Sequence, residues 1–240
     1  MTELVYHTDA YLREFEAVVT AVDGPAIALD RTAFYPGGGG QPNDLGTLTA
    51  GGQTWTVAKV RKAGAEVWHE LAADPGDLRH LTGLNAHGAL DWERRHRLMR
   101  THTAMHILCG VIFRDYGASV TGGNMEPLRG RMDFEFETMR GELVREIEAA
   151  VNKEIAAARE VRVKSLPRAE AFQIPDLIRT KINLLPEGIA AVRTVEIVGL
   201  DLQADGGTHV ANTREVGRLR IVDYRSKGKI NKRIEVALDD

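Results

Sequence analysis

The first 90 residues carry apolar and polar positions in short alternating runs, with glycine-containing turns between several of them. Such runs are typical of β-strands. The runs lie at residues 15–22, 26–30, 46–49, 55–60, 66–71 and 84–90, with turn signals at Asp23-Gly24, Gly51-Gly52 and Gly64 and a loop over residues 73–77. Short strands joined by frequent glycine turns predict a small barrel.

After residue 91 the apolar pattern changes to a helical period, because apolar residues recur three and four positions apart between residues 92 and 115. Gly117 ends this helix in the manner of a C′ glycine. The pattern also predicts a helix at 141–160 and strands at 131–137, 161–163, 189–198, 218–224 and 233–238. Since helices and strands do not alternate regularly, the predicted fold class is α+β and not a doubly wound sheet. We expect two domains, a barrel over residues 1–90 and an α+β domain over residues 91–240.

The composition of the chain indicates where in the cell the protein is located. The chain has 43% hydrophobic and 27% charged residues, which is ordinary for a globular protein. No apolar run approaches the roughly 20 residues of a membrane span, and no signal peptide is visible after Met1. The single cysteine, Cys109, excludes an intramolecular disulfide and favours a reducing compartment. We therefore expect a cytoplasmic protein that does not associate with membranes.

Positive charge gathers in two segments, although the net charge is −3. The first segment contains Arg94, Arg95, Arg97 and Arg100, and the second contains Arg225, Lys227, Lys229, Lys232 and Arg233 with no acidic residue between them. Such clusters can hold a phosphate backbone, because screening at physiological salt makes the attraction local. The alternative is a solvated basic face.

Two histidines of the predicted helix, His102 and His106, lie four residues apart. This spacing places both imidazoles on one face of the helix, one turn apart, where they can share a metal ion. The spacing alone also fits surface or capped core histidines. Cys109 continues the same face, but it lies about 10 Å from His102 at 1.5 Å per residue. We interpret Cys109 as a small buried apolar residue.

A second group of polar residues runs from Asp201 to Val210, with Gly206-Gly207 between Asp205 and His209. A glycine pair lets the chain turn tightly round an ion. Asp205 and His209 would then complete a four-ligand site with the two helix histidines. Taken alone, this segment is equally consistent with a polar turn between two strands.

Together these motifs resemble a known family. His102-Thr103-Ala104-Met105-His106 and Gly206-Gly207-Thr208-His209-Val210 are similar to motifs of the editing domain of alanyl-tRNA synthetase and of its free-standing relatives, the AlaX proteins. Similar segments also occur at residues 34–42, at 91–95, and at 226–229 with Arg233. The resemblance extends from about residue 10 to residue 238, and the length and the predicted barrel resemble the medium-sized AlaX class.

The resemblance implies a small barrel followed by an editing core, a bound Zn²⁺, and hydrolysis of mischarged tRNA(Ala) carrying serine, with glycine as a second candidate. The implied metal ligands are His102, His106 and His209, with residue 205 as the fourth. The family has cysteine at this fourth place, whereas this chain has Asp205. Carboxylate is a zinc ligand, though a harder one than thiolate. Because of this difference, the sequence leaves open which metal binds and how tightly. It bears less on whether a metal site exists.

Candidate contacts with the substrate adjoin these motifs. Thr103 stands beside the ligand pair, and Gln41 follows four glycines. Both are candidate catalytic residues, although a threonine hydroxyl can equally bond its own helix backbone. Successive glycines let a backbone approach a substrate closely, so we expect Gly38, Gly39, Gly40 and Gln41 to bind substrate. We expect Arg94, Arg95, Arg97, Lys227, Lys229 and Arg233 to contact tRNA.

The role of the metal and two other functions stay open at this point. A metal ion would polarise the ester carbonyl, lower the pKa of a bound water, or hold the amino group of the substrate. One alternative function is a tRNA-binding module that has lost catalysis, with Asp205 marking a decayed metal site. The other is a metallohydrolase that acts on a different ester.

Overall fold

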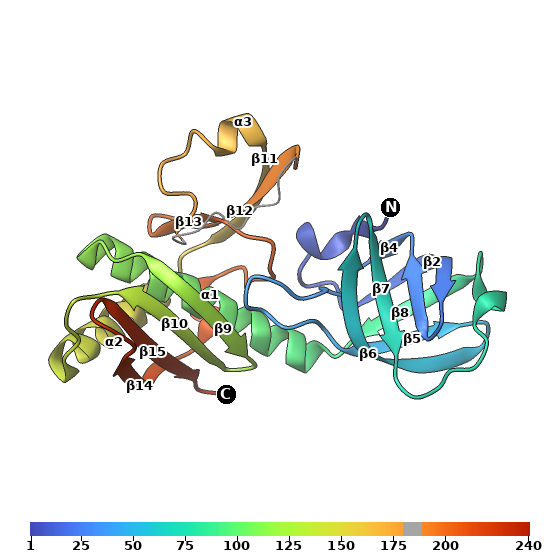
Figure 1. Ribbon diagram of the computed structural model, residues 1–240, viewed down its shortest axis with the longest axis horizontal. Helices are drawn as coiled ribbons and strands as arrows, with labels where there is room; N and C mark the ends of the chain where they lie inside the picture. The colour runs from blue at the N-terminus through green and yellow to red at the C-terminus, as the bar shows by residue number, and fades with distance from the viewer. Residues whose placement is uncertain (180–188) are drawn as a thin grey trace. The chain divides into compact units, whose positions relative to one another are not determined.

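A computed structural model describes residues 1–179 and 189–240 of the chain. The chain separates into two compact units, residues 1–96 and residues 97–240. The first unit contains a closed barrel, and the second combines helices with two antiparallel sheets (Figure 1). The predicted α+β fold class with an N-terminal barrel is therefore confirmed. The expected division into a barrel domain over 1–90 and an α+β domain over 91–240 stays a prediction.

Six strands form the barrel, and all six were predicted. They are β2 (Glu14–Asp23), β3 (Ala26–Leu29), β5 (Gly46–Ala50), β6 (Gln53–Ala63), β7 (Glu66–Leu71) and β8 (Asn85–Leu90), in the closed order β2-β3-β7-β6-β5-β8. Their alternating apolar residues meet inside, where Phe15, Val19, Ile27, Leu48 and Val57 belong to one core. Closure leaves no long strand edge free for pairing with another chain.

The remaining elements of the first unit are too short to give a periodic pattern in sequence. The strands β1 (Glu3–Leu4) and β4 (Arg31–Thr32) pair in parallel. Two short 3₁₀ turns, η1 (Val5–His7) and η2 (Arg79–Leu81), complete the unit.

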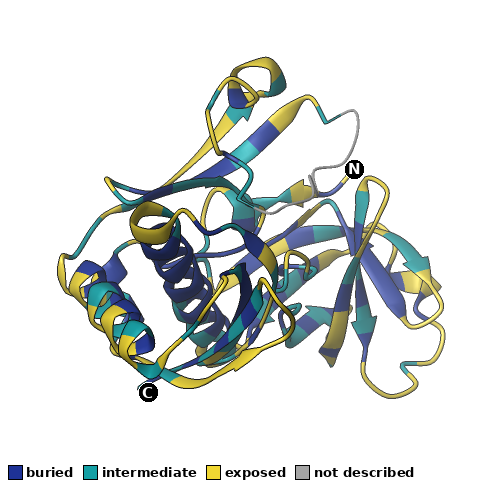
Figure 2. Cartoon of the chain, turned by 60° about the vertical axis from the view of Figure 1, so that its left-hand side comes forward, coloured by how far each residue is buried: buried dark blue, intermediate teal, exposed yellow. Residues whose placement is uncertain are grey.

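The long helix α1 (Trp92–Tyr116) carries the histidine pair. From Thr101 to Ile112 every residue is buried, and the helix is dark blue along its middle in Figure 2. A helix that is buried on all sides places its polar side chains inside the protein together with its apolar ones. Gly117 ends the helix as predicted, with φ +64° and its N–H bonded to the carbonyl oxygen of Phe113 at 2.9 Å. Of the described helices, none is both long and apolar enough to cross a membrane.

A four-stranded sheet and a second helix form one part of the second unit. The sheet has the order β14-β15-β10-β9, from β9 (Val120–Glu126), β10 (Arg129–Glu135), β14 (Leu219–Ser226) and β15 (Asn231–Leu238). The helix α2 (Gly141–Ala156) joins β14 through Asn152, whose Nδ2 donates to the carbonyl oxygen of Leu219 at 2.8 Å. This helix ends earlier than the predicted residue 160, because Ala158 adopts a left-handed conformation with φ +53°. The strand β9 was not predicted, since Gly122 and Gly123 weaken its β pattern.

The other sheet leads into the second candidate motif. It has the order β11-β12-β13, from β11 (Val161–Pro167), β12 (Ala191–Ile197) and β13 (Asp201–Ala204), with the short helix α3 (Arg168–Ala171) after β11 and the 3₁₀ turn η3 (Thr213–Val216) further on. The sequence did not predict β13 as a strand, because it is short and half polar. Asp205 directly follows the last residue of this strand.

Candidate metal centre

Four side chains predicted to bind a metal lie together in the second unit. His102 and His106 come from α1, and Asp205 and His209 come from the turn that follows β13. One ligand atom of each residue lies within 4.8 Å of a ligand atom of every other. Each of the three histidines is at most 7% exposed. The tertiary structure thus brings together two motifs that are about a hundred residues apart in sequence.

The spacing of the donor atoms fits a single ion. Nε2 of His209 lies 3.1 Å from Asp205 Oδ2, and Nε2 of His102 lies 3.6 Å from Asp205 Oδ1. A tetrahedral zinc with Zn–N bonds of 2.0–2.1 Å holds its ligand atoms about 3.4 Å apart. The His102 and His209 rings stack with centroids 4.2 Å apart, and the His106 ring stands edge-on to both. Three imidazoles and one carboxylate are an acceptable set of ligands for zinc.

Burial controls the protonation of the cluster. It lowers the pKa of His102 well below its usual value, and the neighbouring His209 adds to this effect. Burial also lowers the pKa of His209 to about 4. Burial opposes ionisation of Asp205, but the interaction with His102 and the hydrogen bond with His209 outweigh it and hold its pKa well below the usual range. Neutral imidazole and ionised carboxylate are the forms that bind a metal.

His106 differs from the other two histidines. Burial disfavours its charged form, but contact with the carboxylate of Asp201 and the charge of Asp205 outweigh the burial and raise its pKa. Below this raised pKa, a metal ion has to displace a proton from the ring to bind it.

Thr103 lies behind the ligand His209. Its side chain is fully buried. Its Oγ1 accepts a hydrogen bond from the Val210 N–H at 3.2 Å and lies 3.2 Å from Nδ1 of His209. The donor in the contact with Thr103 depends on the tautomer of His209: if a metal ion occupied Nε2, Nδ1 would carry the proton and donate to Thr103. Among the described residues, the hydroxyl contacts His209 and Val210 and not its own helix backbone, so it lies where it can orient a candidate ligand.

The turn that carries Asp205 is held by several hydrogen bonds. Oδ2 of Asp205 accepts from the Gly207 N–H at 2.6 Å. Arg193, on β12, donates from Nη1 to the Asp205 carbonyl oxygen at 2.9 Å, and this nitrogen is 3.8 Å from the Asp205 carboxylate. Sequence analysis did not identify Arg193 as a residue of the site. The available signal was an arginine within the predicted strand at 189–198, in which Val192, Val195 and Ile197 are apolar.

Cys109 is buried, as expected for a small apolar residue. Burial raises the pKa of its thiol above the usual range, so the thiol form is the stable one. The metal cluster found among the described residues does not include it.

The glycine-rich segment forms a defined turn in the first unit. Gly38 and Gln41 exchange two backbone hydrogen bonds of 3.0 and 2.9 Å. Between them, Gly39 and Gly40 have φ angles of +57° and +90°, as a type I′ turn requires. Tyr35 donates from its hydroxyl to the Gly38 carbonyl oxygen at 3.0 Å, and Gln41 is 2% exposed. The segment is an ordered turn, and contact of Gly38, Gly39, Gly40 and Gln41 with a substrate stays a prediction.

The predicted tRNA contact at Arg95 is wrong. Its side chain is 0% exposed, so no phosphate can reach it. Its Nε donates to the Asp44 carboxylate at 2.9 Å, and its Nη1 donates to the Ala10 carbonyl oxygen at 2.9 Å. A buried guanidinium with these partners holds loops of the first unit together, because an unpaired buried charge is costly.

The other predicted tRNA contacts retain accessible surface to different degrees. Arg94 is half-buried and donates to the Asn43 carbonyl oxygen at 3.3 Å. Arg97, in the second unit, bonds the carboxylate of Asp240. Their contact with tRNA stays a prediction.

Three further candidates lie on the hairpin between β14 and β15. Lys227 and Lys229 are exposed. Arg233 is 13% exposed and donates to both oxygens of Asp133 at 2.7 and 2.8 Å. Arg233 is therefore already neutralised. Nζ of Lys227 also lies 3.6 Å from the Asp133 carboxylate, but both lysines are exposed and are the more accessible charges for a phosphate.

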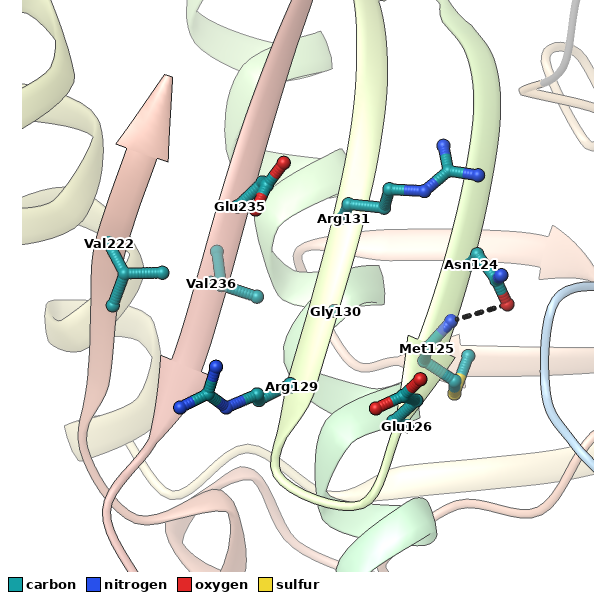
Figure 3. Close-up of a pocket in the computed structure, with 9 residues that line it drawn as sticks. All are labelled: Asn124, Met125, Glu126, Arg129, Gly130, Arg131, Val222, Glu235 and Val236. Carbon is teal, nitrogen blue, oxygen red and sulfur yellow. Dashed lines mark hydrogen bonds between the residues drawn. The ribbon is translucent and has the colours of Figure 1, made fainter. Parts of the chain in front are cut away.

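A hollow of about 210 Å³ lies on the four-stranded sheet (Figure 3). Its walls carry Arg129 and Arg131 together with Glu126 and Glu235, and none of the four clustered ligand residues lines it. Mixed charges of this kind neutralise one another. The histidine cluster, and not this hollow, has the chemistry of a reactive site.

Known proteins match the chain over nearly its full length. Two family models match, tRNA synthetases class II (A) over residues 5–94 and the threonyl and alanyl tRNA synthetase second additional domain over residues 192–235. The chain is 39% identical over 238 residues to the alanyl-tRNA editing protein AlaX-M of Saccharolobus solfataricus, covering 98% of each chain. It is also 39% identical over 247 residues to AlaX-M of Methanosarcina acetivorans, covering 100% of each. An alanine–tRNA ligase of Ignicoccus hospitalis is 38% identical over 230 residues, but these cover 24% of that protein.

Proposed function

The chain belongs to the AlaX family of alanyl-tRNA editing proteins, which are deacylases, and from this premise we propose that it hydrolyses Ser-tRNA(Ala) in a zinc-dependent site. Gly-tRNA(Ala) is a second candidate substrate. The observation that carries the proposal is the buried cluster of His102, His106, Asp205 and His209, whose ligand atoms lie within 4.8 Å of one another. Because its substrate is a tRNA, a cytoplasmic location remains the expectation.

The four clustered side chains would bind the ion, and neighbouring groups would fix the orientation of these ligands. A bound Zn²⁺ supplies a Lewis acid that polarises the ester or its water, or a point of attachment for the amino group of the substrate. Thr103 orients His209, and the Gly207 N–H with Arg193 orients Asp205. Ligands that are held in this way lose little freedom when a metal binds.

Discrimination against alanine would come from the serine hydroxyl. A site that hydrogen-bonds a hydroxyl rejects a substrate without it, because the polar groups of the site are then left unpaired. Gln41 and the turn at Gly38–Gly40 are our candidates for substrate contacts. Arg94, Arg97, Lys227, Lys229 and Arg233 are our candidates for contacts with the phosphates of tRNA(Ala), and Arg95 is removed from this set because it is buried.

The decisive experiment measures deacylation by zinc-loaded protein with Ser-tRNA(Ala), Gly-tRNA(Ala) and correctly charged Ala-tRNA(Ala). We expect serine to be removed at least about 100-fold faster than alanine. Correctly charged Ser-tRNA(Ser) tests whether the tRNA body is read, and His102→Ala is the inactive control. Equal rates on serine and alanine, or no hydrolysis by metal-replete protein, would contradict the proposal.

The same experiment separates the two alternatives. A tRNA-binding module without catalysis would bind tRNA(Ala) and leave all three esters intact. A hydrolase for another ester would leave the aminoacyl-tRNAs intact and cleave simple esters.

A further inference from the structure

A buried carboxylate lies behind His106 on α1. Asp201, the first residue of β13, places Oδ2 at 3.3 Å from Nδ1 of His106, and its side chain is 0% exposed. Apart from this approach, His106 Nδ1 has no hydrogen-bond partner among the described residues. We propose that Asp201 is a positioning residue that fixes the tautomer and orientation of His106 for metal binding. This inference rests on the metal site proposed above.

The position of Asp201 decides which nitrogen of His106 is left for a metal. A carboxylate at Nδ1 keeps the proton on that nitrogen, so Nε2 becomes the donor. His102 and His209 also direct Nε2 toward Asp205. All three imidazoles would then bind the ion through the same type of nitrogen, and each ring would keep the geometry that the helix and the turn impose.

Two side chains hold the Asp201 carboxylate in place. Gln203 donates from Nε2 to Oδ2 at 2.7 Å, and Arg179 places Nε at 3.5 Å from Oδ1. The Arg179 guanidinium in turn lies 3.7 Å above the ring of Phe113 on α1. A buried carboxylate without a cation is costly, so Arg179 makes the charge behind His106 tolerable.

Helix α1 lacks a side chain at the place where Asp201 approaches it. Gly110 lies one turn after His106, and a Cβ added there would lie 3.0 Å from Cβ of Asp201 and 3.0 Å from Cγ of Leu200. Glycine is a poor helix former compared with alanine. Its presence in a buried helix is explained by the close approach of β13, which brings the carboxylate to the ring. This contact is independent evidence that the helix accommodates Asp201.

A purely structural ion pair between Asp201 and Arg179 is the competing explanation, and metal affinity separates the two. The test is Asp201→Asn in the full chain, which preserves shape and removes the charge. Zn²⁺ affinity is measured by competition with a chelator, Co²⁺ is used to record the visible spectrum of the site, and thermal unfolding without metal reports the fold. We expect Zn²⁺ affinity to fall about 10- to 100-fold, with a changed Co²⁺ spectrum.

The matched control is Asp133→Asn. Asp133 is also buried and paired with an arginine in the same unit, but it does not contact the cluster, so its Zn²⁺ affinity should equal that of the unaltered protein. If Asp201→Asn lowers thermal stability and leaves Zn²⁺ affinity within twofold, Asp201 is only structural and the inference is wrong.

A second measurement needs no variant. In ¹⁵N spectra of the histidine rings of zinc-loaded protein, we expect Nδ1 of His106 to carry a proton and Nε2 to be bound to metal. Coordination through Nδ1 would overturn the inference even if Asp201→Asn does not fold. If the unaltered protein binds no metal, the proposed zinc site and this inference fail together. If it binds zinc through Nδ1 of His106, the inference fails alone.

Discussion

Asp205 occupies the ligand position at which the family resemblance implies cysteine. Its carboxylate oxygens lie 3.1 and 3.6 Å from the nitrogens of His209 and His102, which is the separation expected of two ligands on one ion. A carboxylate is a harder donor than a thiolate, so the metal should exchange more readily than in a protein with cysteine at this position.

Substitution of Asp205 tests direct ligation. We expect Asp205→Ala to lose metal and deacylation together, with metal affinity reduced at least about tenfold, since even an indirect partner is worth that much. Asp205→Cys should retain a metal and bind zinc more tightly, because thiolate is the softer ligand. Metal analysis and deacylation rates on both variants provide the measurement. Normal metal content with reduced activity in Asp205→Ala would place the carboxylate outside the set of ligands, and normal values of both would remove it from the site.

The contacts of Thr103 with His209 and Val210 give it a role in the site that does not depend on contact with a substrate. Thr103→Val keeps the shape of the side chain, but it leaves Nδ1 of His209 and the Val210 N–H without their partner. We expect Zn²⁺ affinity to fall by about tenfold or more, whereas Thr103→Ser, which keeps the hydroxyl, should retain most of it. Chelator competition measures both affinities. Equal affinity in Thr103→Val and the unaltered protein would rule out the orienting role.

The barrel contains a buried histidine that belongs to no candidate site. His69, on β7, is 0% exposed; its Nδ1 donates to the Ile27 carbonyl oxygen at 3.0 Å, and its Nε2 lies 2.8 Å from the Thr32 hydroxyl. Burial lowers the pKa of His69 to about 4, although the bond to Ile27 acts in the opposite direction. The folded barrel therefore binds the neutral ring, and the unfolded chain takes up a proton near pH 6.5.

This difference makes the stability of the barrel depend on pH. Because the folded pKa lies below the unfolded value, the contribution is fully present above pH 6.5 and is lost as the pH falls from 6.5 toward 4. At pH 5 the loss is about 2 kcal/mol, since each pKa unit corresponds to about 1.4 kcal/mol. Chemical denaturation at pH 7.5 and at pH 5 measures the free energy of unfolding at each pH. Between these two pH values, we expect the free energy of unfolding of His69→Gln to fall by about 2 kcal/mol less than that of the unaltered protein. Identical pH slopes, or a ring that titrates near pH 6.5 by NMR, would contradict it.

For the molecule as a whole, net charge and local charge have different consequences. A net charge of −3 does not attract a polyanion, so tRNA affinity has to come from local clusters. The structure divides these clusters into buried, paired and accessible members. Arg95 is buried with Asp44, and Arg233 is bonded to Asp133. Lys227 and Lys229 are exposed, with Nζ of Lys227 3.6 Å from the Asp133 carboxylate.

The two lysines make a prediction about salt dependence. If both contact phosphates, Lys227→Ala with Lys229→Ala should weaken tRNA binding and flatten the log–log dependence of affinity on salt by about 0.7–0.9 per contact. Filter binding of tRNA(Ala) over a range of salt concentrations measures the slope. The matched control is Lys59→Ala with Lys62→Ala, two exposed lysines of β6, which should leave the slope unchanged. An unchanged slope in the first double variant would assign the hairpin lysines to solvent.

Local patterns predicted a large part of this fold. The six barrel strands and the helix at residues 92–115 were predicted because alternation and helical period arise from burial within a single element. The ligand set was predicted from motif spacing and the family resemblance, since residues four apart on a helix share a face whatever surrounds them. The strands β9 and β13 were missed, because glycine, short length and polar composition weaken the local pattern.

Other features depend on contacts between distant segments. In sequence, Arg95 belongs to a basic cluster of the kind that contacts phosphates. In the structure it is buried in an ion pair with Asp44, which lies 51 residues earlier in the chain. Asp201 and Arg193 join the site through strands that pack beside α1 and the turn of Asp205. The sequence of one element determines which faces are apolar and which ligands share a turn. Which charge is buried, and which ring nitrogen is free for a metal, depends on partners that approach only when the chain has folded.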